Sequence, residues 1–190
     1  MGWTFDPHHT IVGFSAKHLG ITTVRGIFKE FNADVELDDD GNPTTAAGRV
    51  VVKAASLDTA NEQRDGHLRS ADFFDVENYP DIVFVAKSVT RKSDDEYDVM
   101  GELTIKDVTR EIALVYEHGG LVTDPYGNVK VGGSLTGTVN RTDFGLKWNV
   151  PLGSGGLLVS EKIKIEVEGQ LAQTKQAADQ SASAEATAAV

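Results

Sequence analysis

The chain has 190 residues and a formal net charge of −11, with 18 Lys+Arg against 29 Asp+Glu. This excess of acidic residues argues against a protein that binds nucleic acid or anionic lipid surfaces, because both kinds of binding need a basic face. Hydrophobic residues make up 40% and charged residues 25%, so we expect one domain with a buried core, over residues 1–171. Cysteine is absent from the sequence, which excludes disulfides and thiolate chemistry.

The two ends of the sequence carry no targeting or catalytic signal. The first nine residues have neither the basic start nor the apolar run of a secretion signal, which predicts a cytoplasmic protein. No stretch approaches the ~20 apolar residues of a transmembrane helix. Residues 172–190 are mostly Ala, Gln, Ser and Thr, and we expect them to form a flexible tail.

Alternation with a period of two dominates the rest of the chain. Val12, Phe14 and Ala16 point to one face while Ser15 and Lys17 point to the other, which is typical of a half-buried strand. Turn-forming clusters separate such rows. The pattern predicts about eight strands, near residues 10–18, 24–37, 48–57, 82–91, 97–106, 109–118, 129–141 and 160–171. Many short antiparallel strands favour an all-β fold, either a closed barrel or a sandwich.

Residues 58–70 lack alternation and predict a short helix between strands. The segment begins with Asp58 and Thr59, which cap helix N-termini well. The residues that would share one helical face are Asn61, Arg64, Asp65 and Leu68. Such a helix would cover one end of a barrel.

Signals for catalysis or metal binding are weak. No pair among the five histidines has the i, i+4 spacing of a two-histidine site, so we expect no metal. No Gly-x-Ser-x-Gly elbow is present, and the glycine-rich run at 153–156 lacks the lysine of a phosphate loop. The only polar concentration at helical spacing consists of Asn61, Arg64, Asp65 and His67.

The apolar faces of the predicted strands indicate a different function, the binding of a small ligand inside a barrel. An eight-stranded barrel is just wide enough to be filled by its side chains or to hold one small ligand. Gly132, Gly133 and Gly137, interleaved with Leu135 and Val139, would leave free volume inside. A solid core is the alternative that composition leaves open.

Several motifs follow one another along the chain in a recognisable order and spacing. The opening motifs are Asp6-Pro7-His8-His9 and Phe14-Ser15-Ala16-Lys17-His18-Leu19-Gly20, followed by Thr23-Val24-Arg25-Gly26-Ile27-Phe28. The central motifs are Ser56-Leu57-Asp58-Thr59, Arg64-Asp65, His67-Leu68 and Asp72-Phe73-Phe74-Asp75, and two later ones are Gly101-Glu102-Leu103-Thr104-Ile105 and Arg141-Thr142-Asp143-Phe144-Gly145. Together these motifs resemble the YceI-like polyisoprenoid-binding family over nearly the whole chain up to Leu171.

The resemblance implies a lipocalin-like antiparallel barrel that encloses the tail of an isoprenoid quinone or a related amphiphile. We therefore expect a carrier or buffer of such a lipid, with no cofactor beyond the bound ligand. The apolar residues expected along the interior are Phe14, Ala16, Ile27, Phe31, Phe84, Leu103, Ile112, Leu135, Val139, Phe144, Trp148 and Ile163. The polar groups expected near the mouth are His18, Arg64 and His67.

Two other functions stay open at this point. An enzyme acting on a small amphiphile would use the cluster of Asn61, Arg64, Asp65 and His67. A regulatory binding module would instead act through a protein partner. An exposed strand edge is compatible with a homodimer, although the sequence does not demand one.

Overall fold

The computed structural model describes residues 2–153 and 155–174. Its strands are β1 (Gly2–Phe5), β2 (Ile11–His18), β3 (Thr22–Phe28), β4 (Phe31–Glu36), β5 (Ala47–Lys53), β6 (Leu57–Asp58), β7 (Asp81–Arg91), β8 (Glu96–Ile105), β9 (Val108–Thr123), β10 (Val129–Asn140) and β11 (Val159–Thr174). The helices are α1 (Glu62–Arg69) and four short 3-10 turns, η1 (Pro7–His9), η2 (Pro43–Thr45), η3 (Ala54–Ser56) and η4 (Arg141–Phe144).

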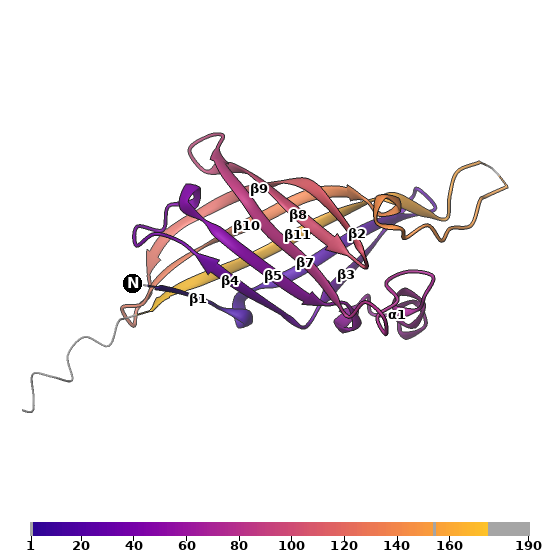
Figure 1. Cartoon of the computed structure of the whole chain (residues 1–190), viewed down its shortest axis with the longest axis horizontal. Coiled ribbons are helices and arrows are strands. Elements are labelled where there is room, and N and C mark those ends of the chain that lie inside the picture. Colours follow the sequence, from indigo (N-terminus) through magenta and orange to yellow (C-terminus); the bar gives the residue numbers. More distant parts are fainter. Residues whose placement is uncertain (1, 154, 175–190) are drawn as a thin grey trace, which may run out of the picture.

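All the strands belong to one antiparallel sheet that curls round on itself (Figure 1). The strand order is β4-β5-β7-β8-β9-β10-β11-β2-β3-β6, and β1 also pairs with β11. Figure 1 shows α1 and the segment between β10 and β11 at one end of the sheet, and the start of β1 at the opposite end. The predicted all-β, lipocalin-like fold with one short helix is confirmed.

The curled sheet has a corner where β3 continues into β4 and β5 continues through η3 into β6. On one side of this corner, Lys29 N donates to Ser56 O at 3.2 Å and extends the pairing of β3 with β6; on the other side, Lys53 N donates to Glu30 O at 2.9 Å and extends the pairing of β4 with β5. Next to this corner, the ring of Phe5 on β1 meets the ring of Phe31 at the start of β4 edge-on at 5.8 Å. Backbone bonds and aromatic packing thus hold the sheet in its curled shape.

The count of strands differs from the predicted eight. The row at 24–37 is two strands, because β3 ends at Phe28 and β4 begins at Phe31. The four-residue β1 and the two-residue β6 are too short to show alternation. At the other terminus, β11 continues to Thr174, past the expected domain boundary at 171. The remainder of the predicted tail, 175–190, lies outside the described residues.

Helix α1 begins later than predicted. Asn61 is its N-cap and accepts a hydrogen bond from Arg64 N at 2.9 Å. Asp58 instead ends β6, pairs with Lys29 Nζ at 2.6 Å, and accepts from Ala60 N. Neither this helix nor any other in the described part of the chain is long and apolar enough to cross a membrane.

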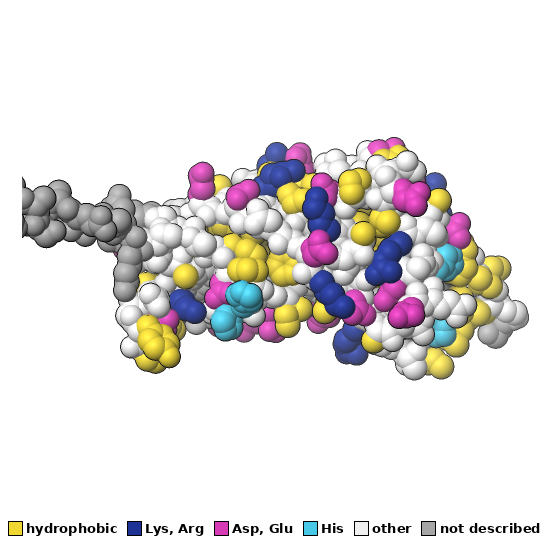
Figure 2. Space-filling model, turned by 90° about the horizontal axis from the view of Figure 1, so that it is seen from below, with side chains coloured by type: hydrophobic (Ala, Val, Ile, Leu, Met, Phe, Trp, Pro, Cys, Tyr) yellow, Lys and Arg dark blue, Asp and Glu magenta, His cyan; other side chains and the backbone are white. Residues whose placement is uncertain are grey.

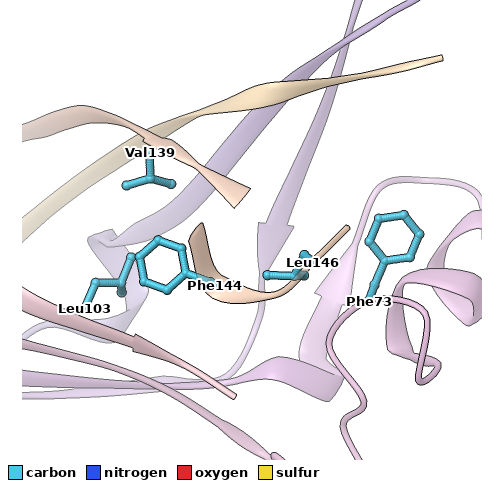
Figure 3. Packing of buried hydrophobic residues seen from close by; sticks show 5 residues of the cluster. All are labelled: Phe73, Leu103, Val139, Phe144 and Leu146. Atoms are coloured by element: carbon cyan, nitrogen blue, oxygen red, sulfur yellow. The ribbon is translucent and has the colours of Figure 1, made fainter. Parts of the chain in front are cut away.

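Buried apolar side chains gather at the α1 end of the sheet. In Figure 3, Leu103 of β8, Val139 of β10 and Phe144 of η4 point toward one another, with Leu146 between them and Phe73. A second cluster joins Phe28, Val52 and Leu57, where β3, β5 and β6 come together. Leu68 and Phe74 pack against both clusters, so α1 and the loop after it are anchored to the sheet.

Two phenylalanines lie over glycines of neighbouring strands. A Cβ added to Gly101 on β8 would lie 2.3 Å from Cζ of Phe84, and a Cβ added to Gly26 on β3 would lie 2.4 Å from Cζ of Phe14. In the register of the sheet Phe14 faces Gly26 directly, whereas Gly101 faces Ala86, two residues from Phe84. The absence of a side chain at these glycines makes room for the rings.

We therefore expect Gly101→Ala to lower the free energy of unfolding by ~1–3 kcal/mol, because the ring of Phe84 must move. Gly66→Ala is the matched control, since its added Cβ meets no heavy atom within 4 Å and Gly66 lies inside α1. That substitution should raise the unfolding free energy by ~0.5–1 kcal/mol. Urea unfolding measures both, and equal effects at the two positions would contradict the packing described here.

Candidate ligand-binding cavity

A cavity of about 920 Å³ lies inside the curled sheet at the α1 end. Its volume is near the upper end of the ~300–1,000 Å³ typical of ligand pockets. The apolar lining residues include Val24, Phe28, Val52, Ile82, Ile105, Leu114, Leu146 and Ile165, together with Leu68, Phe73 and Phe74 from α1 and the loop after it. The cavity is therefore suited to an apolar occupant.

Most of the residues predicted from the sequence line this cavity. They are Phe14, Ala16, His18, Arg64, His67, Phe84, Leu103, Ile112, Leu135, Val139, Trp148 and Ile163. Those that belong to β2, β8, β10 and β11 lie on the strand face that alternation predicts to be inward. Their role in binding a ligand stays a prediction.

Three predicted lining residues lie elsewhere. Ile27 is 41% exposed on the outer face of β3, while its neighbours Gly26 and Phe28 are buried. Phe31 packs against the ring of Phe5 and does not line the cavity. Phe144 is 2% exposed and fills the core below the cavity wall. The corner at Lys29 and Glu30 breaks the alternation between β3 and β4, and this break explains why Ile27 faces outward.

A second cavity of about 240 Å³ continues toward the opposite end of the sheet. It is smaller than a typical ligand pocket, so it is better described as an extension than as a separate site. Four residues line both cavities, and we call them the waist: Val50, Phe84, Leu135 and Val167. The ring of Phe84 is held at the waist by its contact with Gly101.

Polar lining residues of the large cavity concentrate around α1. Thr59, Asn61, Gln63, Arg64 and His67 come from the helix and the loop before it. The imidazole of His67 meets Trp148 edge-on at 4.6 Å and Phe73 at 5.1 Å, and its Nε2 lies 2.9 Å from Asp72 Oδ2. We call His67, Phe73 and Trp148 the aromatic cluster. It forms part of the cavity wall next to these polar groups.

The polar cluster considered for an enzyme is divided between two surfaces. Asp65 is 6% exposed and accepts hydrogen bonds from the backbone N and the hydroxyl of Thr59. Arg64 donates from Nε to Thr59 Oγ1 and from Nη2 to Thr59 O. Asp65 lies toward an outer groove, whereas Arg64 and His67 line the cavity. These bonds fix the loop before α1.

Sequence reasoning missed Arg141 as a cavity-lining residue. It begins η4 directly after β10, is 5% exposed, and lines the large cavity. Its Nε donates to Ser160 O at 3.0 Å and its Nη1 donates to Leu146 O. Alternation does not predict a charged residue on an apolar wall. The signal that includes Arg141 is the motif Arg141-Thr142-Asp143-Phe144-Gly145, which is part of the family resemblance.

Exposed apolar side chains surround the same end of the molecule. Ile21 is 77% exposed in the β2–β3 turn, and Val150 and Leu157 are also exposed in the segment before β11. Figure 2 shows hydrophobic side chains gathered at the end away from the grey trace. The backbone N of Leu19 donates to Leu158 O at 2.8 Å, so the two segments are joined. Among residues 2–153 and 155–174, no group of three or more His, Asp or Glu side chains could hold a metal ion.

This arrangement defines a lipocalin-like antiparallel barrel with an apolar internal cavity. The family model for the YceI-like domain matches residues 3–171. UPF0312 protein SAS2572 of Staphylococcus aureus strain MSSA476 is 36% identical over 169 residues, which cover 88% of this chain and 95% of that protein. The chain therefore belongs to the YceI-like family.

Solved structures share the fold. The crystal structure of the Campylobacter jejuni YCEI protein matches with a TM-score of 0.71 and 32% identity, over 84% of this chain and 90% of that one. A polyisoprenoid binding domain from Saccharophagus degradans matches with a TM-score of 0.66 and 13% identity, over 92% and 99%. At that lower identity the likeness concerns the fold alone.

The small cavity is lined in part by a half-buried phenol. Tyr116 donates its hydroxyl to Gly132 O at 3.0 Å and lies 3.3 Å from His118 Nδ1. Burial, with a smaller contribution from Tyr97, raises the pKa of Tyr116 from 10.0 to about 12. Burial also lowers the pKa of His118. Both shifts favour the neutral form in an apolar environment.

Because the pKa of Tyr116 is raised in the fold, its contribution to stability is present below pH 10.0 and is lost as the pH rises toward about 12. We expect the near-ultraviolet absorbance of phenolate to show a late ionisation step close to that upper value. Tyr116→Phe should remove this step and leave the earlier ones in place. A late step of unchanged amplitude in the variant would assign it to another tyrosine.

Proposed function

We propose that the protein binds the apolar chain of an isoprenoid-type lipid, such as an isoprenoid quinone, in the large cavity. The observation that carries the proposal is the cavity of about 920 Å³ with a largely apolar lining. The fold shared with a domain described as polyisoprenoid binding supports the same ligand class. The protein would act as a cytoplasmic carrier or buffer that needs no further cofactor.

The energetics of burial favour a chain-shaped apolar ligand. Each CH₂ group that leaves water for the cavity contributes ~0.8 kcal/mol, before the cost of ordering the chain is subtracted. The cavity wall contributes aliphatic and aromatic side chains from eight strands, β2, β3, β5, β7, β8, β9, β10 and β11, so the contact continues along the chain. The polar groups at the α1 end favour an orientation with the headgroup there and the chain toward the waist.

Binding without catalysis is part of this proposal. Asp65, the carboxylate of the polar cluster, is occupied by two hydrogen bonds from Thr59 and lies toward the outer groove. His67 keeps Asp72 as its partner. The cluster thus serves to fix the loop before α1 and the aromatic cluster beside the cavity.

Trp148 provides a direct readout of binding. It lines the large cavity, whereas Trp3, the second of two tryptophans in the chain, bonds to Asp38 O near β1. In a Trp3→Phe background, an isoprenoid quinone should quench Trp148 fluorescence and saturate at one molecule per protein. Quenching that never saturates, or none at all, would count against the proposal.

The waist should set the chain length that the large cavity accommodates. With quinones of increasing chain length, we expect the Kd to fall by at least ~10-fold for each isoprene unit until the chain reaches Phe84, and then to level off. Phe84→Ala should join the two cavities and shift this limit to longer chains.

Phe14→Ala is the matched control for chain length. Phe14 lines the large cavity but not the small one. Its ring lies over Gly26 in the same way as the ring of Phe84 lies over Gly101. Its truncation should weaken binding of all chain lengths without moving the limit. A limit that is the same in wild type and Phe84→Ala would show that the waist does not end the binding site.

A further inference from the structure

Arg141 has a hydrogen-bonding group that the described residues do not satisfy. Its Nε and Nη1 donate to the carbonyls of Ser160 and Leu146. These two bonds hold the guanidinium between the start of β11 and the segment that follows η4. Its Nη2 is buried and has no hydrogen-bond partner among residues 2–153 and 155–174. A buried donor left unpaired destabilises the folded state, and more so when it is charged.

The positive charge of Arg141 also lacks a direct negative partner. Among the described residues, no carboxylate forms an ion pair with it. The face of the Phe73 ring lies 5.9 Å from the guanidinium carbon and offers partial compensation. Burial lowers the pKa of Arg141 and the more distant charge of Glu161 raises it, but a guanidinium stays protonated in proteins. The wall of an apolar cavity therefore carries a cation without an ion-pair partner among the described residues.

The position of Arg141 fits a headgroup at the α1 end. Phe73, which lies beside it, belongs to the aromatic cluster with His67 and Trp148. Three of these four residues reach the cavity from α1 or the loops at that end, and Arg141 follows the end of β10. Since Nη2 is itself buried, a ligand oxygen would reach it by a small shift of this cluster.

We propose that Arg141 anchors the ligand headgroup by donating from Nη2 to an anionic oxygen, such as that of a phosphate or carboxylate. The proposal rests on the proposed function and narrows its ligand class: a prenyl chain that ends in an acidic group should bind more tightly than one that ends in a neutral quinone. Arginine binds such oxygens through charge-assisted hydrogen bonds, about twice as strong as neutral ones. A neutral carbonyl would satisfy the donor but would leave the charge uncompensated.

The test compares two probes that share one prenyl chain, the prenyl monophosphate and the prenyl alcohol, in the full-length protein. A hydrogen bond to a charged group contributes ~1.5–3 kcal/mol, so wild type should prefer the monophosphate by about 10- to 100-fold. In Arg141→Gln, this preference should fall to near one while the alcohol still binds within about threefold of wild type. Trp148 fluorescence reports binding of both probes.

Arg69→Gln is the matched control. Arg69 likewise donates two hydrogen bonds to backbone carbonyls, those of Ala55 and Leu57, but lies along the outer groove. Its replacement should retain the preference for the monophosphate. If Arg141→Gln does not fold, Arg141→Lys takes its place, and its preference should fall below that of wild type because an ammonium cannot keep both carbonyl contacts and reach the ligand.

Four results would overturn the assignment. In the first, wild type binds both probes with equal affinity. In the second and third, the Arg141 variant keeps the wild-type preference or loses the same affinity for both probes. In the fourth, inorganic phosphate displaces the prenyl monophosphate at a comparable concentration. The last result would indicate a free-anion site instead of a lipid headgroup site. Failure of both probes to bind wild type would contradict the proposed function itself, whereas binding of the alcohol alone would contradict only the role of Arg141.

Discussion

The inner face of the curled sheet is apolar along most of its length, yet its side chains leave about 920 Å³ unfilled. Protein interiors normally contain few voids larger than a water molecule, because each unfilled space forfeits dispersion contacts. A cavity of this size is retained only if the backbone around it is stable without a packed centre. The continuous antiparallel pairing from β4 to β6, which the bonds of Lys29 and Lys53 extend into the corner between β3 and β4, supplies that stability.

The two ends of the cavity differ in chemistry, and this difference gives the ligand a direction. At the α1 end, Arg64, His67 and Arg141 stand beside aromatic rings and exposed apolar turns. At the other end, Phe84 and its neighbours narrow the space before the small cavity with Tyr116. A ligand with one polar end and one apolar chain matches this polarity.

Alternation predicted most of the cavity wall because β2, β8, β10 and β11 keep a regular pleat. It failed where the pleat is interrupted: Ile27 seemed equivalent to Phe31 until the corner at Lys29 separated β3 from β4. Position 26 faces inward, and a glycine fits there because the ring of Phe14 occupies the space that a side chain would fill. Arg141 could not be assigned from pattern alone, since a charged residue enters an apolar wall only with tertiary partners such as Ser160 O and Leu146 O.

Native mass spectrometry of protein purified without detergent, followed by organic extraction of the bound material, tests most directly whether the cavity holds an apolar chain. Recovery of a prenyl or other long-chain lipid at one molecule per protein is the expected result. Its headgroup and chain length would then identify the ligand that this cavity selects. A mass equal to that of the polypeptide, together with no uptake of isoprenoid quinones on titration, would contradict lipid binding.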